Sequence, residues 1–215
     1  MCRLALMNKA GADFIEKTYG LTAFLTYLES RLGGHGNGYA LIKDGKCVDL
    51  RKGVNLTNRT IVKAVKKTDF DWFIYHTRLA SCGTIADRNC HPFQHPLTGD
   101  ILAANGTERD IVLYNRDNHI DRTDTETLLL DFLRDDQFFA DTGICWSTLV
   151  GVHKGKAFAR RNLGSLYKLA LTPNIIALAS EFSPRLQALA YACNGYYEPG
   201  FEFSTEANSK YKAAK

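Results

Sequence analysis

The chain begins Met1-Cys2-Arg3-Leu4-Ala5-Leu6-Met7, a cysteine followed by a charged residue and a short apolar run. A cysteine directly after the initiator methionine can become the first residue of the mature chain, where it carries both a thiol and a free α-amino group. A thiol needs a neighbour to accept its proton near pH 7, and an α-amino group, with a pKa of about 7.7 to 8.0, suits that task. The residues from Arg3 to Met7 predict a buried strand, which would hold this terminus in the core. A lone Met-Cys is commonplace, so the rest of the chain must decide whether Cys2 reacts.

Composition indicates one globular protein. The 215 residues are 45% hydrophobic and 23% charged, enough for a single sizeable core. We expect one domain over residues 1–207 and a polar, basic tail over residues 208–215. The net charge of +4 is slight, and its clearest cluster, Lys63 with Lys66 and Lys67, is typical of a solvated helix face. The charge does not favour a nucleic-acid partner.

The sequence also bears on the cellular compartment. No stretch approaches the roughly 18 consecutive apolar residues of a membrane span, so we expect a cytoplasmic protein with no membrane contact. No pair of cysteines has C-x-x-C spacing, and a chain of this size in a reducing compartment needs no disulfides. We therefore expect free thiols at all six cysteines, which are Cys2, Cys47, Cys82, Cys90, Cys145 and Cys193.

Local patterns predict strands joined mostly in hairpins, with helices grouped between them. Apolar residues at spacings of three and four predict a helix over 21–32, ended by Gly33-Gly34. Asp44-Gly45 predicts a tight hairpin turn. Further hairpins are expected to turn at 153–156 and 172–174, and further helices at 60–67, from Thr123 and from Ser183-Pro184. With eight or nine strands in total, the pattern predicts an α+β fold.

Polar residues follow two apolar strands. The strand at 72–75 leads into His76-Thr77-Arg78, and the strand at 101–104 leads into Asn105-Gly106. Thr123-Asp124-Thr125-Glu126 has the form of a capping box, with Leu128, Leu129, Phe132 and Leu133 on the inward helix face. Arg78 and Asn105 can face a common cleft from their strand ends. Such a cleft suits an amino-acid amide, which needs a cation and an anion for its charged end and donors for the developing oxyanion.

Taken together, these segments resemble the class II glutamine amidotransferases, a family of Ntn hydrolases, and in particular its short stand-alone type. The resemblance rests on five segments in the family's order, and Arg160 to Ser180 is similar to the family's last strand pair. The matching segments are Met1-Cys2-Arg3-Leu4, His35-x-x-Gly38-x-Ala40, His76-Thr77-Arg78-Leu79-Ala80-Ser81-x-Gly83 with Asn89-x-His91-Pro92-Phe93, Asn105-Gly106, and Thr123-Asp124-Thr125-Glu126. The resemblance implies a four-layer αββα sandwich, in which two mostly antiparallel sheets pack between helices.

The resemblance also implies roles for individual residues. Cys2 would be the nucleophile that attacks the side-chain amide of glutamine, with its own α-amino group as base. Asn105 and Gly106 would form the oxyanion hole. Arg78 would bind the α-carboxylate of the substrate and Asp124 its α-ammonium group.

The same resemblance also implies roles for two further residues, and it implies the substrate, the cofactors and the partner. His76 and Ser81 would belong to the substrate-binding region, where His76 is expected to position the loop rather than react. The resemblance implies no cofactor and no metal. It implies glutamine as the substrate, and a separate synthase subunit as a possible acceptor of the ammonia.

Two features depart from the pattern. Residue 104 is alanine where many relatives have histidine, which leaves Asn105 and Gly106 in place but removes a local support. A retained Met1 would block the α-amino group and deprive Cys2 of its base.

Two alternatives stay open from the sequence. The same frame serves hydrolases of other γ-glutamyl amides, and we expect loops 84–100 and 107–122 to select substrate and partner. A Cys/His metal-binding module is the alternative of a different class, but only His91-x₃-His95 has a common zinc spacing. Its candidate ligands are His76, Cys82, Cys90, His91 and His95.

Overall fold

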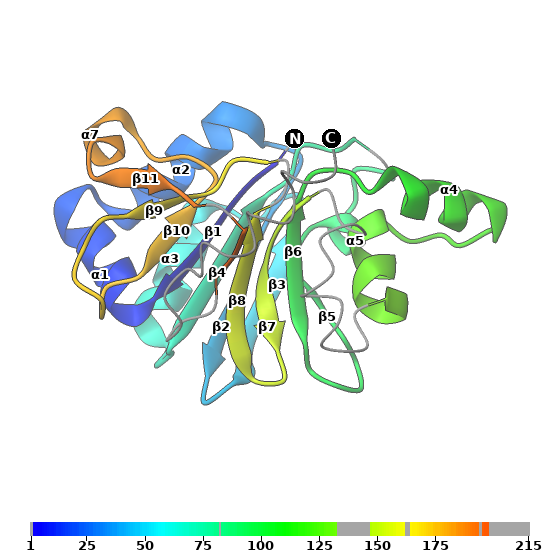
Figure 1. Cartoon of the computed structure of the whole chain (residues 1–215), viewed down its shortest axis with the longest axis horizontal. Helices are drawn as coiled ribbons and strands as arrows, with labels where there is room; N and C mark the ends of the chain where they lie inside the picture. Colours follow the sequence, from blue (N-terminus) through cyan, green and yellow to red (C-terminus); the bar gives the residue numbers. More distant parts are fainter. Residues whose placement is uncertain (1, 82, 133–146, 162–163, 194, 198–215) are drawn as a thin grey trace, which may run out of the picture.

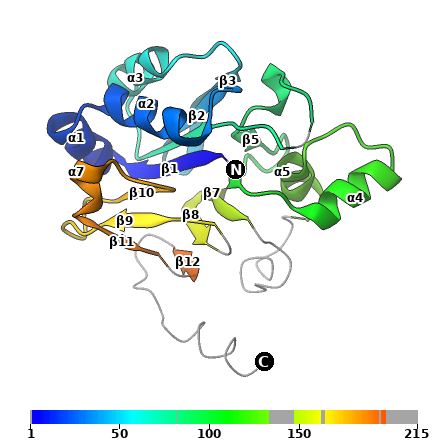
Figure 2. The same cartoon turned by 90° about the horizontal axis from the view of Figure 1, so that it is seen from above.

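The computed structural model describes residues 2–81, 83–132, 147–161, 164–193 and 195–197. Two β-sheets pack face to face, and helices cover their outer faces (Figures 1 and 2). The expected four-layer α+β sandwich is therefore confirmed. The expected tail at 208–215 lies outside the described residues.

The first sheet has seven strands, and β1 lies inside it. Its order is β11 (Ala190–Ala192), β9 (Tyr167–Leu169), β10 (Ala177–Ala179), β1 (Arg3–Asn8), β4 (Trp72–Thr77), β2 (Asn37–Lys43) and β3 (Lys46–Gly53). Every pair is antiparallel. Arg3 lies opposite Thr77 of β4, and Ala5 lies opposite both Tyr75 and Ala179. Because β1 has a hydrogen-bonded strand on each side, the start of the chain is fixed in the sheet.

The second sheet has five antiparallel strands. Its order is β12 (Gly195–Tyr197), β8 (Lys156–Arg161), β7 (Thr148–His153), β6 (Ile101–Asn105) and β5 (Phe93–Gln94). The β7–β8 hairpin turns at Lys154 and Gly155, both with positive φ, and the β2–β3 hairpin turns at Asp44 and Gly45 in the same way. These turns lie where the sequence predicts them.

Helices cover both outer faces. On the first sheet lie α1 (Lys9–Thr18), α2 (Leu21–Leu32), α3 (Asn58–Lys67) and the single turn α7 (Pro184–Gln187). On the second sheet lie α4 (Arg109–Asp117), α5 (Asp124–Thr127) and the π-helical turn η2 (Leu128–Phe132), while a short 3₁₀ turn, η1 (Asp87–Asn89), precedes β5. Among the described helices, none is long and apolar enough to cross a membrane. The cytoplasmic location stays a prediction.

Three apolar cores join the four layers. Strand β1 contributes to two of these cores. Ala5 and Met7 face the helices, while Leu4 and Leu6 face the other sheet. This alternation is the two-residue period of a strand that is buried on both faces. The third core, between the second sheet and α4, α5 and η2, includes Leu102, Ile111, Leu128, Leu129 and Phe158.

Several local expectations need correction. Helices α1 and α4 lie where no helix was predicted, and α4 occupies part of the expected loop 107–122. Phe132 was expected to face inward but is 40% exposed. The cause is the π-helical turn, because its wider spacing rotates Phe132 away from the face that Leu128 and Leu129 bury. Leu133 lies outside the described residues. Pro184 starts α7 as predicted, but the Ser183 side chain makes no capping hydrogen bond.

Candidate active site

Cys2 lies just before β1 and is buried, with 7% of its surface exposed. Its sulfur accepts a hydrogen bond from the Leu79 N–H over 3.3 Å and lies 3.5 Å from the Leu79 carbonyl oxygen, to which the thiol donates. Leu79 belongs to the segment after β4, which is itself tied down, because Ala80 N–H donates to His35 Nδ1 over 3.0 Å. The N-terminal thiol is therefore held against the end of β4.

The environment favours the protonated thiol. Burial is the largest influence and raises the pKa of Cys2, although the hydrogen bond with Leu79 and the charge of Arg78 act in the opposite direction. A cysteine with a raised pKa is a poor nucleophile until a base takes its proton. The site therefore requires a base close to Cys2.

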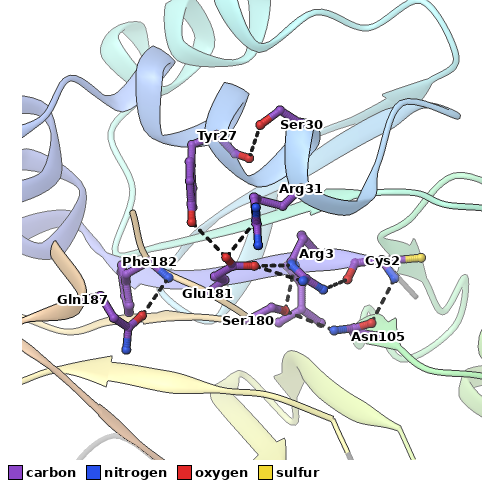
Figure 3. Close-up of polar contacts among 11 residues, drawn as sticks. Cys2, Arg3, Tyr27, Ser30, Arg31, Asn105, Ser180, Glu181, Phe182 and Gln187 are labelled. Carbon is purple, nitrogen blue, oxygen red and sulfur yellow. Dashed lines mark hydrogen bonds and ion pairs between the residues drawn. The ribbon is translucent and has the colours of Figure 1, made fainter. Parts of the chain in front are cut away.

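Asn105, the last residue of β6, binds the backbone of Cys2. Its Oδ1 accepts the Cys2 N–H over 3.0 Å, and its Nδ2 donates to Ser180 Oγ over 3.3 Å (Figure 3). Ser180 follows β10, and its Oγ also accepts the Leu4 N–H over 3.1 Å. These contacts fix which way the Asn105 amide points. An amide nitrogen carries two N–H donors, and the bond to Ser180 uses one of them.

Gly106 continues from Asn105 with a backbone that favours glycine. Its φ is +152°, and an added Cβ would lie 2.8 Å from Cβ and 2.9 Å from Cα of Ser147. Ser147 is fixed in turn, because its N–H donates to Glu108 Oε1 over 2.7 Å. The close approach therefore excludes a side chain at residue 106.

Two buried histidines hold the peptide before Asn105. His76 Nε2 donates to the Ala104 carbonyl over 3.0 Å, and His91 Nδ1 accepts the Ala104 N–H over 3.3 Å. The two rings stack at 4.2 Å between centroids. Burial lowers the pKa of His76 to about 3 and that of His91 well below its ordinary value, so both rings are neutral. The alanine at residue 104 put the local support of Asn105 in doubt, and His76 and His91 supply that support instead.

Arg78 and Asp124 bring opposite charges near Cys2. Arg78 is 3% exposed and Asp124 5% exposed. Arg78 Nη1 donates to the Thr84 carbonyl over 3.0 Å, and Asp124 Oδ2 accepts the Glu108 N–H over 2.8 Å. Arg78 acts to lower the pKa of Cys2 and Asp124 acts to raise it. Both charges therefore lie close enough to the thiol to influence it.

Ser81 lies at the exposed rim of this site. Its hydroxyl is 2.8 Å from the hydroxyl of Thr107. Ser81 belongs to the loop after β4 and Thr107 to the loop after β6, so the pair links the segments that follow Arg78 and Asn105. The described structure thus brings every predicted site residue to one end of the two sheets.

The sequence did not point to a further group beside Cys2. Arg3 Nη1 donates to the Cys2 carbonyl over 3.2 Å, and its Nε and Nη2 bind Glu181 Oε2 over 3.1 and 2.9 Å. Glu181 Oε1 also accepts the Tyr27 hydroxyl over 2.8 Å and Arg31 Nε over 2.9 Å (Figure 3). The sequence held one indication of this group, because Arg3 is a charged residue at the start of a buried strand and a buried charge requires a partner.

The candidate metal ligands do not converge. His76 and His91 bind the Ala104 backbone, while His95 Nδ1 accepts the N–H groups of Leu97 and Thr98 over 3.1 and 3.2 Å. Within the described residues, no group of three or more histidine, cysteine or acidic side chains is placed to hold a metal ion. Cys82 lies outside those residues. The described cysteines Cys2, Cys47, Cys90 and Cys193 are free thiols.

The family described as "Glutamine amidotransferases class-II" matches residues 1–142. No curated protein matches the sequence. Among solved structures, the glutamine phosphoribosylpyrophosphate amidotransferase of B. subtilis, complexed with ADP and GMP, is similar with a TM-score of 0.62 and 16% identity over 95% of this chain and 50% of its own.

Two further structures share the fold. One is described as the allosteric regulatory enzyme of purine biosynthesis, with a TM-score of 0.60 and 19% identity over 93% of this chain and 46% of its own. The other, a glutamine aminotransferase class-II domain protein from Silicibacter pomeroyi, has a TM-score of 0.52 and 15% identity over 94% of this chain and 100% of its own. The chain thus spans about half the length of the first two.

Proposed function

The chain belongs to the class II glutamine amidotransferases, enzymes that hydrolyse the side-chain amide of glutamine with an N-terminal cysteine, and we propose that Cys2 is this nucleophile once Met1 is removed. One observation carries the proposal. The Cys2 nitrogen lies 3.0 Å from Asn105 Oδ1, while the sulfur of the same residue is held on Leu79. The future amine is therefore fixed at the end of β6, and the thiol is fixed just after β4.

The first half of the reaction transfers the glutamyl group to sulfur. The α-amino group of Cys2 accepts the thiol proton, and the sulfur attacks the amide carbon of glutamine to form a C–S bond. The resulting oxyanion receives hydrogen bonds from the second Asn105 Nδ2–H and the Gly106 N–H. The α-ammonium group then gives its proton to the leaving nitrogen, so that the C–N bond breaks, ammonia departs and a thioester remains.

The second half releases glutamate. The α-amino group takes a proton from water, and the resulting hydroxide attacks the thioester carbon at the same oxyanion site. The C–S bond breaks, and the sulfur regains a proton from the α-ammonium group. The raised pKa of Cys2 suits this cycle, because the resting thiol stays protonated and the sulfur readily takes back its proton when the thioester breaks.

Arg78 and Asp124 suit the charged end of glutamine. A guanidinium binds a carboxylate through two parallel hydrogen bonds, so Arg78 takes the α-carboxylate. Asp124 takes the α-ammonium group. Ser81 contributes at the rim through its contact with Thr107. His76 holds the Ala104 peptide and so positions Asn105 without touching the substrate.

The ammonia is proposed to pass to a synthase. The B. subtilis neighbour is named as an amidotransferase of phosphoribosylpyrophosphate, and the present residues cover 50% of its length. The acceptor site would then lie outside residues 1–215.

Glutamate release from glutamine by the purified protein tests the proposed function. Mass measurement of the intact chain should show loss of one methionine, and Cys2→Ala should abolish release. Cys47→Ala is the matched control, because Cys47 is a free thiol on β3 away from this site. A glutamine-analogue electrophile should label Cys2 and spare Cys90. Full activity in Cys2→Ala would exclude the mechanism.

A further inference from the structure

Arg3 and Glu181 form an ordered contact beside the reacting residue. The side chain of Arg3 is 12% exposed and that of Glu181 is 20% exposed. Arg3 contacts one carboxylate oxygen through both Nε and Nη2, and its Nη1 reaches the Cys2 carbonyl. In Figure 3 the Cys2 sulfur points away from this cluster, so the arginine contacts the backbone of Cys2 and not its thiol.

Glu181 is built to stay ionised and fixed. Burial acts to raise its pKa, but hydrogen bonds from Tyr27 and Arg3 and the charges of Arg3 and Arg31 outweigh burial, and the pKa is lowered. Tyr27 and Arg31 both belong to α2, and Glu181 follows β10. The carboxylate therefore ties Arg3 to a helix and a strand end at once.

We propose that Glu181 and Arg3 are positioning residues for the α-amino group of Cys2, with Glu181 orienting Arg3 and Arg3 holding the amine in its neutral, proton-accepting form. This inference rests on the proposed function. Arg3 reaches the Cys2 carbonyl and Glu181 reaches Arg3, so both act through Cys2.

The positioning follows from the covalent geometry of one residue. The carbonyl and the amino group of Cys2 are attached to the same Cα, and the sulfur is attached through Cβ. When Arg3 fixes the carbonyl and Asn105 fixes the nitrogen, rotation about the bonds to Cα is restricted. The amine is thereby kept within reach of the thiol proton.

The charge effect follows from the proximity of two cations. An ammonium group beside a guanidinium is disfavoured, so its pKa falls and the neutral amine becomes more abundant at a given pH. Arg78 acts in the same direction, whereas Asp124 and Glu181 favour the ammonium form. The nearby rings of His76 and His91 are neutral because burial lowers their pKa values. Among these charges, Arg3 donates to the peptide group of Cys2 itself.

The test is the pH dependence of kcat/KM for glutamine in processed protein. Removing the charge with Arg3→Gln should raise the amine's pKa and move the acidic limb of the profile upward by roughly one pH unit. Arg3→Lys keeps the charge, so its limb should stay near that of the wild type while kcat falls because the paired contact with Glu181 is lost. Glu181→Gln removes the opposing charge, so the limb should move downward.

The control is Arg51→Gln, which removes an exposed arginine paired with Asp49 on β3 and should leave the profile unchanged. An unmoved limb in Arg3→Gln, even with a lower kcat, would overturn the inference, as would equal shifts in Arg3→Gln and Arg3→Lys. If the processed wild type releases no glutamate, the proposed function itself fails, which is a different outcome. Unfolding midpoints of all variants identify any that fail to fold, and if Arg3→Gln is one of them, the downward move of the limb in Glu181→Gln decides, because an unmoved limb there would overturn the inference.

Discussion

Asn105 Oδ1 accepts the backbone N–H of Cys2 over 3.0 Å, which joins the first strand of one sheet to the end of a strand in the other. The same amide presents its nitrogen to Ser180, which follows β10. The Asn105 side chain is thus proposed to orient Cys2 through its oxygen and to bind the oxyanion through its nitrogen. A mutation that removes only the nitrogen can separate the two roles.

Asn105→Asp should lower kcat about 10²- to 10³-fold with a small change in KM. The carboxylate keeps an acceptor for the Cys2 nitrogen but lacks the N–H donors, so the loss reports on the oxyanion. Steady-state glutamate release measures it. Asn118→Ala, at an exposed asparagine after α4, is the control. A normal kcat in Asn105→Asp would contradict the assigned role.

An uncleaved residue before Cys2 should inactivate the enzyme. In that chain the Cys2 nitrogen is a peptide nitrogen, which still donates to Asn105 but has no basic lone pair. Loss of a positioned base lowers rates by about 10² to 10⁴. The experiment compares an N-terminal tag with the same tag at the C-terminus, using glutamate release and the unfolding temperature. Comparable activity in the two proteins would show that the α-amino group is not the base.

Arg78→Lys and Asp124→Asn should raise KM for glutamine by about tenfold or more. Arg78→Lys weakens the binding of the α-carboxylate and Asp124→Asn that of the α-ammonium group, and both groups are bound in the ground state as well as in the transition state. Lysine keeps the charge at residue 78 but not the paired geometry. The control Arg116→Gln removes an exposed arginine on α4 that pairs with Asp117. A lower kcat with an unchanged KM would place these residues elsewhere in the reaction.

His76→Gln should flatten the dependence of stability on pH. Burial lowers the pKa of His76 to about 3, below its ordinary 6.5, so the unfolded chain takes up a proton that the folded chain excludes. The contribution to the free energy of unfolding is complete above about pH 6.5 and is lost as the pH falls toward 3, by about 1.4 kcal/mol per pH unit. Glutamine keeps an N–H for the Ala104 carbonyl.

Urea unfolding at several pH values between 4.5 and about 7 measures this slope. His119→Asn is the matched control, because it removes an exposed histidine from a positive-φ position that asparagine tolerates. Equal slopes for His76→Gln and the wild type would mean that His76 is not held neutral in the folded protein.

Each of the predicted site residues is marked by its immediate neighbours in the sequence. Cys2 stands before an apolar strand, Arg78 and Asn105 stand directly after apolar strands, and Asp124 follows an N-cap threonine. A strand's end and a helix's start can be predicted from neighbours in sequence, so these positions and an α+β fold were expected from local patterns, whereas the four-layer sandwich and the residue roles followed from the family resemblance.

Long-range partners explain what could not be predicted. Arg3 and Glu181 are separated by 178 positions, and Asn105 and Ser180 by 75. No local pattern marks Ser180 or Glu181, since both simply follow a short strand. The helix at Arg109–Asp117 was missed for a different reason, because it buries only Ile111 and Asn115, while its apolar residues Leu113 and Tyr114 are exposed.

The central place of β1 sets an order of events during synthesis. β1 is made first, yet its neighbour β10 comprises residues 177–179, which leave the ribosome about 10 to 35 s later at ordinary translation rates. During that interval the N-terminus lacks its second neighbour and is open to removal of Met1. Ser180 and Glu181, which orient Asn105 and Arg3, arrive together with β10. The removal of Met1 that the proposed function requires would therefore come before assembly, and a nascent chain carries the thiol long before the site is complete.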